Sequence, residues 1–204
     1  MTLKRLSPED PRLRQVCEDM SLAELRRKEM QKTIDSLLDF VFQRNNKGPA
    51  HNKKKPTIIG LSANQVGVMK RICIVDLAIR RKGYSEIHVL VNPHITWRSK
   101  TMQLRKEGCV NLPNIWGYVP RSIKIDVSYL DRWGNSYEMR AVGWAATLIQ
   151  HEVDHLNGLL FIDRIEDPKK ALHVEESDFL AYKKDPKKWD KYIDVSKLTR
   201  AISK

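Results

Sequence analysis

The stretch QHEVDHLNG, residues 150–158, contains two histidines four positions apart, with a glutamate directly after the first. Positions i and i+4 of a helix share a face, so His151 and His155 can direct their imidazole nitrogens at one metal ion. Glu152 projects about 100° further round the helix, where it can accept a proton from a water on that metal. The pattern H-E-x-x-H therefore indicates metal-assisted hydrolysis.

A catalytic metal site usually takes three protein ligands, and this motif supplies two. The extension H-E-x-x-H-x-x-G-x-x-H is followed as far as Gly158, but its last position is Phe161, and no methionine follows to form a Met-turn. Two sources of a third ligand stay open: Cys109, which follows a glycine, or a glutamate further along the chain. The candidate glutamates stand among polar residues: Glu166, Glu175 and Glu176.

The helix that carries both histidines is expected over residues 142–158. The segment VGWAATLIQHEVDHLNG is apolar on nearly every face before the histidines, which is typical of a helix buried inside a domain. Asn157 and Gly158 are expected to end it, because glycine readily adopts the left-handed cap conformation.

A further helix is expected over residues 20–43, where Ser21 and Glu24 form a capping box. Between the two helices the signal is mostly strand, with β-branched apolar runs and clean alternation before the turn DRWGN. The expected strands are residues 71–79, residues 87–93 and a hairpin over residues 122–141. Strand-rich segments followed by one central helix indicate the α+β class.

Composition limits the class of protein. The chain has 204 residues, of which 41% are hydrophobic and 30% charged, as in one globular domain. No apolar run approaches the roughly 18 residues of a membrane span, and the first residues carry no signal-peptide core. We therefore expect a cytoplasmic protein of bacterial type, and a processed organellar form is also compatible. The three cysteines, an odd number, then indicate reduced thiols.

The net charge is +12 and the sequence pI is about 9.7. This excess of positive charge favours contact with a polyanion. The alternative is a basic surface that only contacts solvent. No aromatic-and-basic nucleic-acid motif accompanies the charge, so neither a sequence-specific nucleic-acid partner nor a membrane partner is expected. Residues 168–204 are polar and lysine-rich, and we expect them to form a basic C-terminal extension that is partly helical.

Three separated motifs resemble those of the peptide deformylases and occur in the same order. GLSANQVG resembles the family's G-x-G-L-A-A-x-Q, EGCVN resembles E-G-C-L-S, and QHEVDHLNG resembles Q-H-E-x-D-H-L-x-G. The match in register extends from about Pro11 to Ile165 and includes VNP at 91–93 and YVPR at 118–121. The resemblance implies a catalytic domain over residues 1–167, with antiparallel sheets packed around the buried helix of the HEVDH motif.

The resemblance also implies the ligands, the metal and the reaction. Cys109 becomes the third ligand beside His151 and His155, and a thiolate with two imidazoles suits Fe2+, Zn2+ or Ni2+. Fe2+ is expected natively, because family members use it. The implied substrate is an N-formylmethionyl peptide, whose formyl group is removed as chains emerge. The basic extension is then expected to meet the ribosome.

The resemblance assigns further roles by position. Glu152 is the proton shuttle, and the developing oxyanion is expected to meet the Gln65 side-chain amide and the Val110 backbone N–H. The expected substrate-binding residues are Ile59, Gly60, Glu107, Trp144 and Leu148, with Thr147 in the methionine pocket and Arg105 at its rim.

The chain departs from the family pattern at several positions. Ile58 stands where the first motif has glycine, Ser62 replaces an alanine, and Trp116 replaces an arginine found in many members. Val110 and Asn111 replace Leu-Ser. Ile58 and Trp144 are large enough to narrow or reshape the methionine pocket.

Two other readings remain open. One is a zincin-like metallopeptidase with Glu175 or Glu176 as third ligand, which loss of metal in Cys109→Ser would exclude. The other is a deformylase paralogue with an altered pocket, or a catalytically silent one that binds ribosomes or nascent chains through its basic surface. Turnover of a formyl-methionine peptide would exclude the silent form.

Overall fold

The computed structural model describes residues 3–42, 58–78, 85–166, 171–174, 178–185 and 192–193. Several sequence expectations fall outside these residues. They are Glu175, Glu176, the domain boundary between 167 and 168, and most of the basic C-terminal extension. Among the described residues, no helix is both long enough and apolar enough to span a bilayer.

The described strands form two antiparallel sheets, and the prediction of an α+β fold with antiparallel sheets is confirmed. The first sheet has the order β1-β2-β3-β6-β7 and the second the order β4-β5-β8-β9. The strands are β1 Gly60–Ser62, β2 Ile72–Asp76, β3 Ile87–Arg98, β4 Met102–Cys109, β5 Leu112–Ser122, β6 Lys124–Leu130, β7 Ser136–Val142, β8 Ala171–His173 and β9 Tyr192–Ile193. The α-helices are α1 Leu22–Leu25, α2 Lys28–Val41, α3 Trp144–Leu156 and α4 Phe179–Lys184, and the 3-10 turns are η1 Pro11–Arg14, η3 Ala63–Val66 and η4 Phe161–Arg164.

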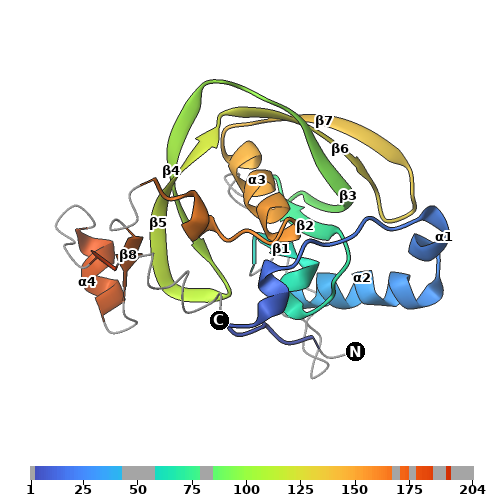
Figure 1. Ribbon diagram of the computed structural model, residues 1–204, viewed down its shortest axis with the longest axis horizontal. Coiled ribbons are helices and arrows are strands. Elements are labelled where there is room, and N and C mark those ends of the chain that lie inside the picture. The colour runs from blue at the N-terminus through green and yellow to red at the C-terminus, as the bar shows by residue number, and fades with distance from the viewer. Residues whose placement is uncertain are drawn as a thin grey trace.

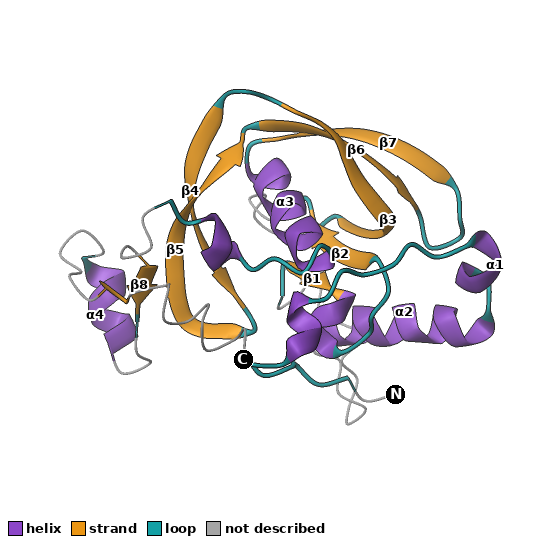
Figure 2. Ribbon diagram, in the orientation of Figure 1, coloured by secondary structure: helices purple, strands orange, loops and turns teal. Residues whose placement is uncertain are grey.

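Helix α3 carries the two histidines. Its residues from Ala146 to Leu156 are all buried, and it contacts strands of both sheets, namely β1, β2, β3, β5 and β7. Figures 1 and 2 show α3 enclosed by the curved strands. Gly158 follows it at φ 72°, where a side chain would strike the Arg14 carbonyl, so the expected end of the helix is confirmed.

Strand β2 is buried on both faces because helices cover both. Cys73 and Val75 pack in the cluster of α3, whereas Ile72 and Ile74 pack in the cluster of α2. A short β-branched run with no polar alternation is what such a strand requires. The β1–β2 edge therefore packs directly against α3.

The prediction of one continuous helix over residues 20–43 is wrong, because the segment forms two helices. The Ser21 cap is present, since its Oγ accepts from the Glu24 N–H at 3.1 Å. However, Arg27 is extended at ψ 139° and divides α1 from α2. The Gln31 side chain donates to the Leu25 carbonyl at 2.8 Å and so satisfies a backbone acceptor at the break.

The expected hairpin is confirmed as β6 and β7. Ile125, Val127 and Tyr129 point into the protein while the residues between them are more exposed. Asp131 closes the turn, because its Oδ1 accepts from the Trp133 and Asn135 backbone N–H groups at 2.9 Å each.

The described part of the C-terminal extension packs against the second sheet. Strand β8 pairs with β5, and helix α4 supplies Tyr182, which is buried. Leu172, Val174 and Tyr182 form a small cluster against which Trp116 packs. Lys106 Nζ lies 3.8 Å from the centre of the Tyr182 ring, a cation–π contact. Figure 1 shows β8 and α4 beside β5.

Candidate metal centre

Three potential ligand atoms meet where the end of β4 faces α3. Cys109 Sγ lies 3.3 Å from His155 Nε2, which lies 3.2 Å from His151 Nε2. All three atoms are within 4.8 Å of one another, and this is the one such group found among the described residues. One thiolate and two imidazoles are a donor set that suits a borderline or soft divalent ion, so these residues fit the implied metal.

Glu107 fixes the orientation of one ligand. Its Oε2 lies 2.8 Å from His151 Nδ1, which leaves His151 Nε2 directed toward Cys109 and His155. The carboxylate is clamped by Arg121 at 2.8 and 2.9 Å. Burial works to raise the pKa of Glu107, but hydrogen bonds from Arg121 and His151 lower it overall. The substrate-binding role expected for Glu107 remains a prediction, since these contacts are with protein side chains.

The same arginine connects β5 to α3 through Asp154. Arg121 Nη1 donates to Asp154 Oδ2 at 2.5 Å, and Arg164 binds Asp154 Oδ1 at 2.7 Å. Although burial opposes it, the hydrogen bonds and charges of Glu107 and Asp154 raise the pKa of Arg121. The sequence alone indicated no role for Arg121 or Asp154, although Arg121 stands in YVPR and Asp154 in QHEVDHLNG.

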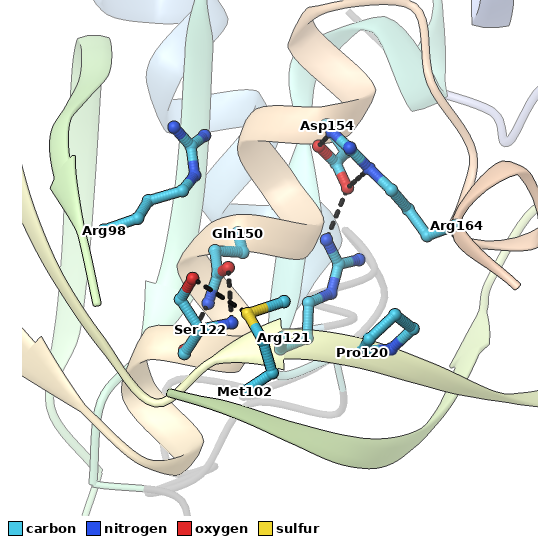
Figure 3. Close-up of a pocket in the computed structure, with 8 residues that line it drawn as sticks. All are labelled: Arg98, Met102, Pro120, Arg121, Ser122, Gln150, Asp154 and Arg164. Carbon is cyan, nitrogen blue, oxygen red and sulfur yellow. Dashed lines mark hydrogen bonds and ion pairs between the residues drawn. The ribbon is translucent and has the colours of Figure 1, made fainter. Parts of the chain in front are cut away.

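Figure 3 shows the polar pocket beside this network, with Asp154 between two arginines. Its volume is about 380 Å³. Its lining residues are Arg98, Met102, Pro120, Arg121, Ser122, Gln150, Asp154 and Arg164.

Glu152 lies on the inner side of α3 against β1. Its side chain is buried, and its Oε2 is 2.8 Å from the Ser62 hydroxyl. Gly60 leaves room for the carboxylate, since a side-chain carbon built there would come within 2.3 Å of Glu152 Oε1. Burial raises the pKa of Glu152, and the hydrogen bond from Ser62 acts in the opposite direction. Sequence reasoning noted Ser62 only as a departure and did not foresee this contact.

Gln65 directs its amide nitrogen toward the ligand cluster. Gln65 Nε2 is 3.3 Å from Cys109 Sγ and 3.2 Å from His155 Nε2. Asn111 Oδ1 accepts from the same nitrogen at 2.9 Å, and Asn111 Nδ2 donates to the Leu6 carbonyl at 3.0 Å. Asn111 is therefore a buried support for Gln65, which the sequence did not indicate.

Val110 lies in the turn between β4 and β5, directly after Cys109. The structure therefore brings it next to the cluster through the chain itself. Its expected role as an oxyanion donor remains a prediction.

Trp144, Thr147 and Leu148, expected around the methionine side chain, lie in the first turns of α3, whereas Ile59 directly precedes β1. Leu148 is buried in the α3 cluster, and Ile59 packs against that cluster. Trp144 begins the helix, and the Thr147 hydroxyl donates to the Gly143 carbonyl at 3.1 Å. Arg105 Nη2 lies 4.0 Å from where a side chain at Gly143 would begin.

Two residues that depart from the family pattern, Ile58 and Trp116, lie outside this group of residues. Ile58 packs in the α2 cluster, and its N–H donates to the Val41 carbonyl at 3.2 Å. Trp116 packs over Gly108 and toward the C-terminal cluster.

An α+β fold in which a Cys/His/His cluster adjoins a buried glutamate defines a metal-dependent hydrolase. Residues 4–171 match the model of the polypeptide deformylase family. The chain belongs to that family, whose members are metal-dependent hydrolases that remove the N-formyl group from nascent polypeptides.

Individual peptide deformylases are similar to this chain in sequence and in structure. The chain is 42% identical to a peptide deformylase of Methylocella silvestris over 120 residues, 58% of this chain and 61% of that protein. It is 35% identical to the Zymomonas mobilis peptide deformylase over 170 residues, 82% and 88% of the two chains. A crystal structure of the Acinetobacter baumannii class I type b peptide deformylase with Met-Ala-Ser bound has a TM-score of 0.68 at 31% identity, and covers 81% of this chain and 99% of that one.

Proposed function

We propose that this chain removes the formyl group from the initiator methionine of nascent polypeptides, with Cys109, His151 and His155 holding one divalent metal. The observation that carries the proposal is the meeting of one thiol and two imidazoles within 4.8 Å. A divalent metal bound there supplies Lewis acidity, which polarises a carbonyl and makes a water more acidic. Fe2+ is the proposed native metal, with Zn2+ and Ni2+ as alternatives.

The residues around the cluster transfer protons, stabilise the oxyanion and orient the ligands. Glu152, buried 2.8 Å from the Ser62 hydroxyl, takes a proton from the attacking water and returns it to the leaving amine. Gln65 Nε2 and the Val110 N–H donate to the oxygen that becomes negative. Glu107 holds His151 in the tautomer that leaves Nε2 free to ligate. Helix α3 acts as the central helix, since it presents both histidines and Glu152 from buried positions.

The methionine side chain is proposed to enter beside the first turns of α3. Leu148, Ile59 and Trp144 supply apolar surface there, and Gly60 keeps the strand edge open next to Glu152. Thr147 completes the pocket, and Arg105 lies at its rim. The Acinetobacter baumannii deformylase is the relative with Met-Ala-Ser bound, which makes the corresponding formylated tripeptide a suitable substrate.

The catalytic domain is proposed to span residues 1–167, followed by a basic extension over residues 168–204. Helix α4 supports a partly helical extension, and the β5–β8 pairing attaches its beginning to the second sheet. The relatives named above are bacterial, and we place the activity in the cytoplasm, with the extension contacting the ribosome.

Formate release is the test. Protein purified without oxygen should release formate from formyl-Met-Ala-Ser and leave acetyl-Met-Ala-Ser intact, because the proposed site is specific for the formyl group. Mass spectrometry of the same mixtures should find no internal peptide-bond cleavage. Cleavage of peptide bonds without formate release would favour a metallopeptidase, and no reaction at all would favour a silent paralogue. Actinonin, which is bound in another Acinetobacter baumannii structure, should inhibit the reaction.

A further inference from the structure

Ser62 stands at a position that is alanine in the family motif G-x-G-L-A-A-x-Q. It ends strand β1, and its side chain is completely buried. Its hydroxyl oxygen lies 2.8 Å from Glu152 Oε2 and 2.8 Å from the main-chain carbonyl oxygen of Glu152. An alanine at this position could make neither contact, so the hydroxyl gives the proposed proton shuttle a hydrogen bond that an alanine could not.

The hydroxyl acts together with the backbone on either side of it. Gly60 and Ser62 are two positions apart on β1 and therefore face the same way, toward α3. Gly60 lies against Glu152 Oε1, while the Ser62 hydroxyl bonds Oε2. The two carboxylate oxygens are thus fixed by different residues of one strand, which limits rotation about the last bond of the Glu152 side chain.

A hydroxyl group has one proton to donate and two lone pairs to accept with. When Glu152 is a carboxylate, Ser62 can donate to Oε2. Both acceptors within reach of the Ser62 proton belong to Glu152, so the hydroxyl ties that residue to strand β1.

The Ser62 backbone holds a second side chain of the site. Its N–H donates to Gln65 Oε1 at 2.7 Å, which turns Gln65 Nε2 toward Cys109 and His155. Removing the Ser62 hydroxyl leaves this backbone bond in place. A substitution by alanine therefore tests the contact with Glu152 alone.

We propose that Ser62 is a positioning residue for Glu152, which it holds in the orientation for proton transfer. This inference rests on the proposed function. Loss of one such hydrogen bond is expected to lower kcat about 3- to 10-fold. KM should stay unchanged, because the Ser62 side chain is fully buried within the protein.

The experiment compares Ser62→Ala with wild type on formyl-Met-Ala-Ser. Ser122→Ala is the matched control, since it also removes one buried hydroxyl but lies on β5. Metal content and the melting temperature of the metal-free protein are measured for all three. The expected result is a lower kcat with unchanged KM and metal content in Ser62→Ala, and no change in kcat in Ser122→Ala.

A double-mutant cycle completes the test. In a Glu152→Ala background, Ser62→Ala should change the residual kcat no further, because the hydroxyl acts through that carboxylate. The inference is overturned if Ser62→Ala has the kcat of the wild type, changes only KM, or loses metal. It is also overturned if the fold-losses in kcat caused by Ser62→Ala and Glu152→Ala multiply in the double mutant. It is overturned as well if Ser122→Ala lowers kcat equally. A wild-type protein that releases no formate would instead remove the proposed function on which the inference rests.

Discussion

Glu107 Oε2 lies 2.8 Å from His151 Nδ1, although the two residues are 44 positions apart and come from different elements. Strand β4 thus supplies both a candidate ligand, Cys109, and the partner of another ligand. Arg121 on the neighbouring strand holds the same carboxylate through two hydrogen bonds. Glu107 and Arg121 therefore fix the orientation of the His151 ring, which should favour metal binding.

Replacing Glu107 with glutamine should weaken metal affinity about 10- to 100-fold, because the amide holds the imidazole less firmly than a carboxylate. Competition with a chelator measures the affinity. Glu138→Gln, on the exposed side of β7, should leave it unchanged. Equal affinity in both variants would show that Glu107 does not orient His151.

Removal of the ligands themselves should abolish metal binding. Cys109→Ser and His155→Ala are expected to lose the single equivalent of metal that we expect in the wild type, because two ligands seldom retain a catalytic ion. Elemental analysis after purification without oxygen measures the loss. Cys17→Ala is the control, since burial raises the pKa of Cys17 to about 11 and keeps it a thiol. Full metal content in His155→Ala would contradict the proposed site.

The pair His151 and His155 could be placed from the sequence because helix periodicity alone puts them on one face. Cys109 could not, because it comes from the end of β4, and nothing local specifies which strand meets α3. The resemblance to a family supplied that ligand. The hairpin β6–β7 was likewise predictable from strict alternation, which leaves one register with the apolar residues inside.

The contacts that support Glu152 and Gln65 could not be predicted either, because they also join segments that are far apart in the sequence. Ser62 and Asn111 read as simple departures in the sequence, yet the fold places one against Glu152 and the other against Gln65. The break between α1 and α2 was missed because apolar residues at near-helical spacing stand on both sides of Arg27. A long-range contact, the Gln31 side chain with the Arg132 carbonyl at 2.9 Å, accompanies that break.

Glu152→Gln should keep the metal and lose turnover by about 10²- to 10⁴-fold. Glutamine has nearly the same shape and can still bond Ser62, but it cannot take up the proton of the attacking water. Steady-state rates with formyl-Met-Ala-Ser, alongside metal analysis, provide the measurement. A rate within a few-fold of wild type would remove Glu152 from the chemistry.

Gln65→Ala should lower kcat by about 10²- to 10³-fold with a smaller effect on KM, because its amide acts mainly on the developing oxyanion. Asn111→Ala should give a smaller loss in kcat, since Gln65 remains but is less firmly held. A raised KM with unchanged kcat in Gln65→Ala would make Gln65 a substrate-binding residue instead.

The C-terminal extension requires substitutions rather than truncation to separate docking from folding. Cutting after Asp167 removes β8 and the buried cluster of Leu172, Val174 and Tyr182. Each of these side chains contributes roughly 1.5–3 kcal/mol by burial, so truncation should destabilise the second sheet as well as remove charge. Loss of activity in the truncated protein would therefore say nothing about the ribosome.

Charge neutralisation isolates the docking role. Glutamine in place of Lys183, Lys184, Lys187, Lys188 and Lys191 should reduce co-sedimentation with ribosomes and spare the turnover of formyl-Met-Ala-Ser. Wild-type binding should weaken steeply as salt rises, because neutralised phosphates release counterions. The matched control replaces five exposed lysines elsewhere, namely Lys4, Lys28, Lys32, Lys100 and Lys124. Equal sedimentation of both variants at low salt would show that net charge, and no particular segment, attracts the ribosome.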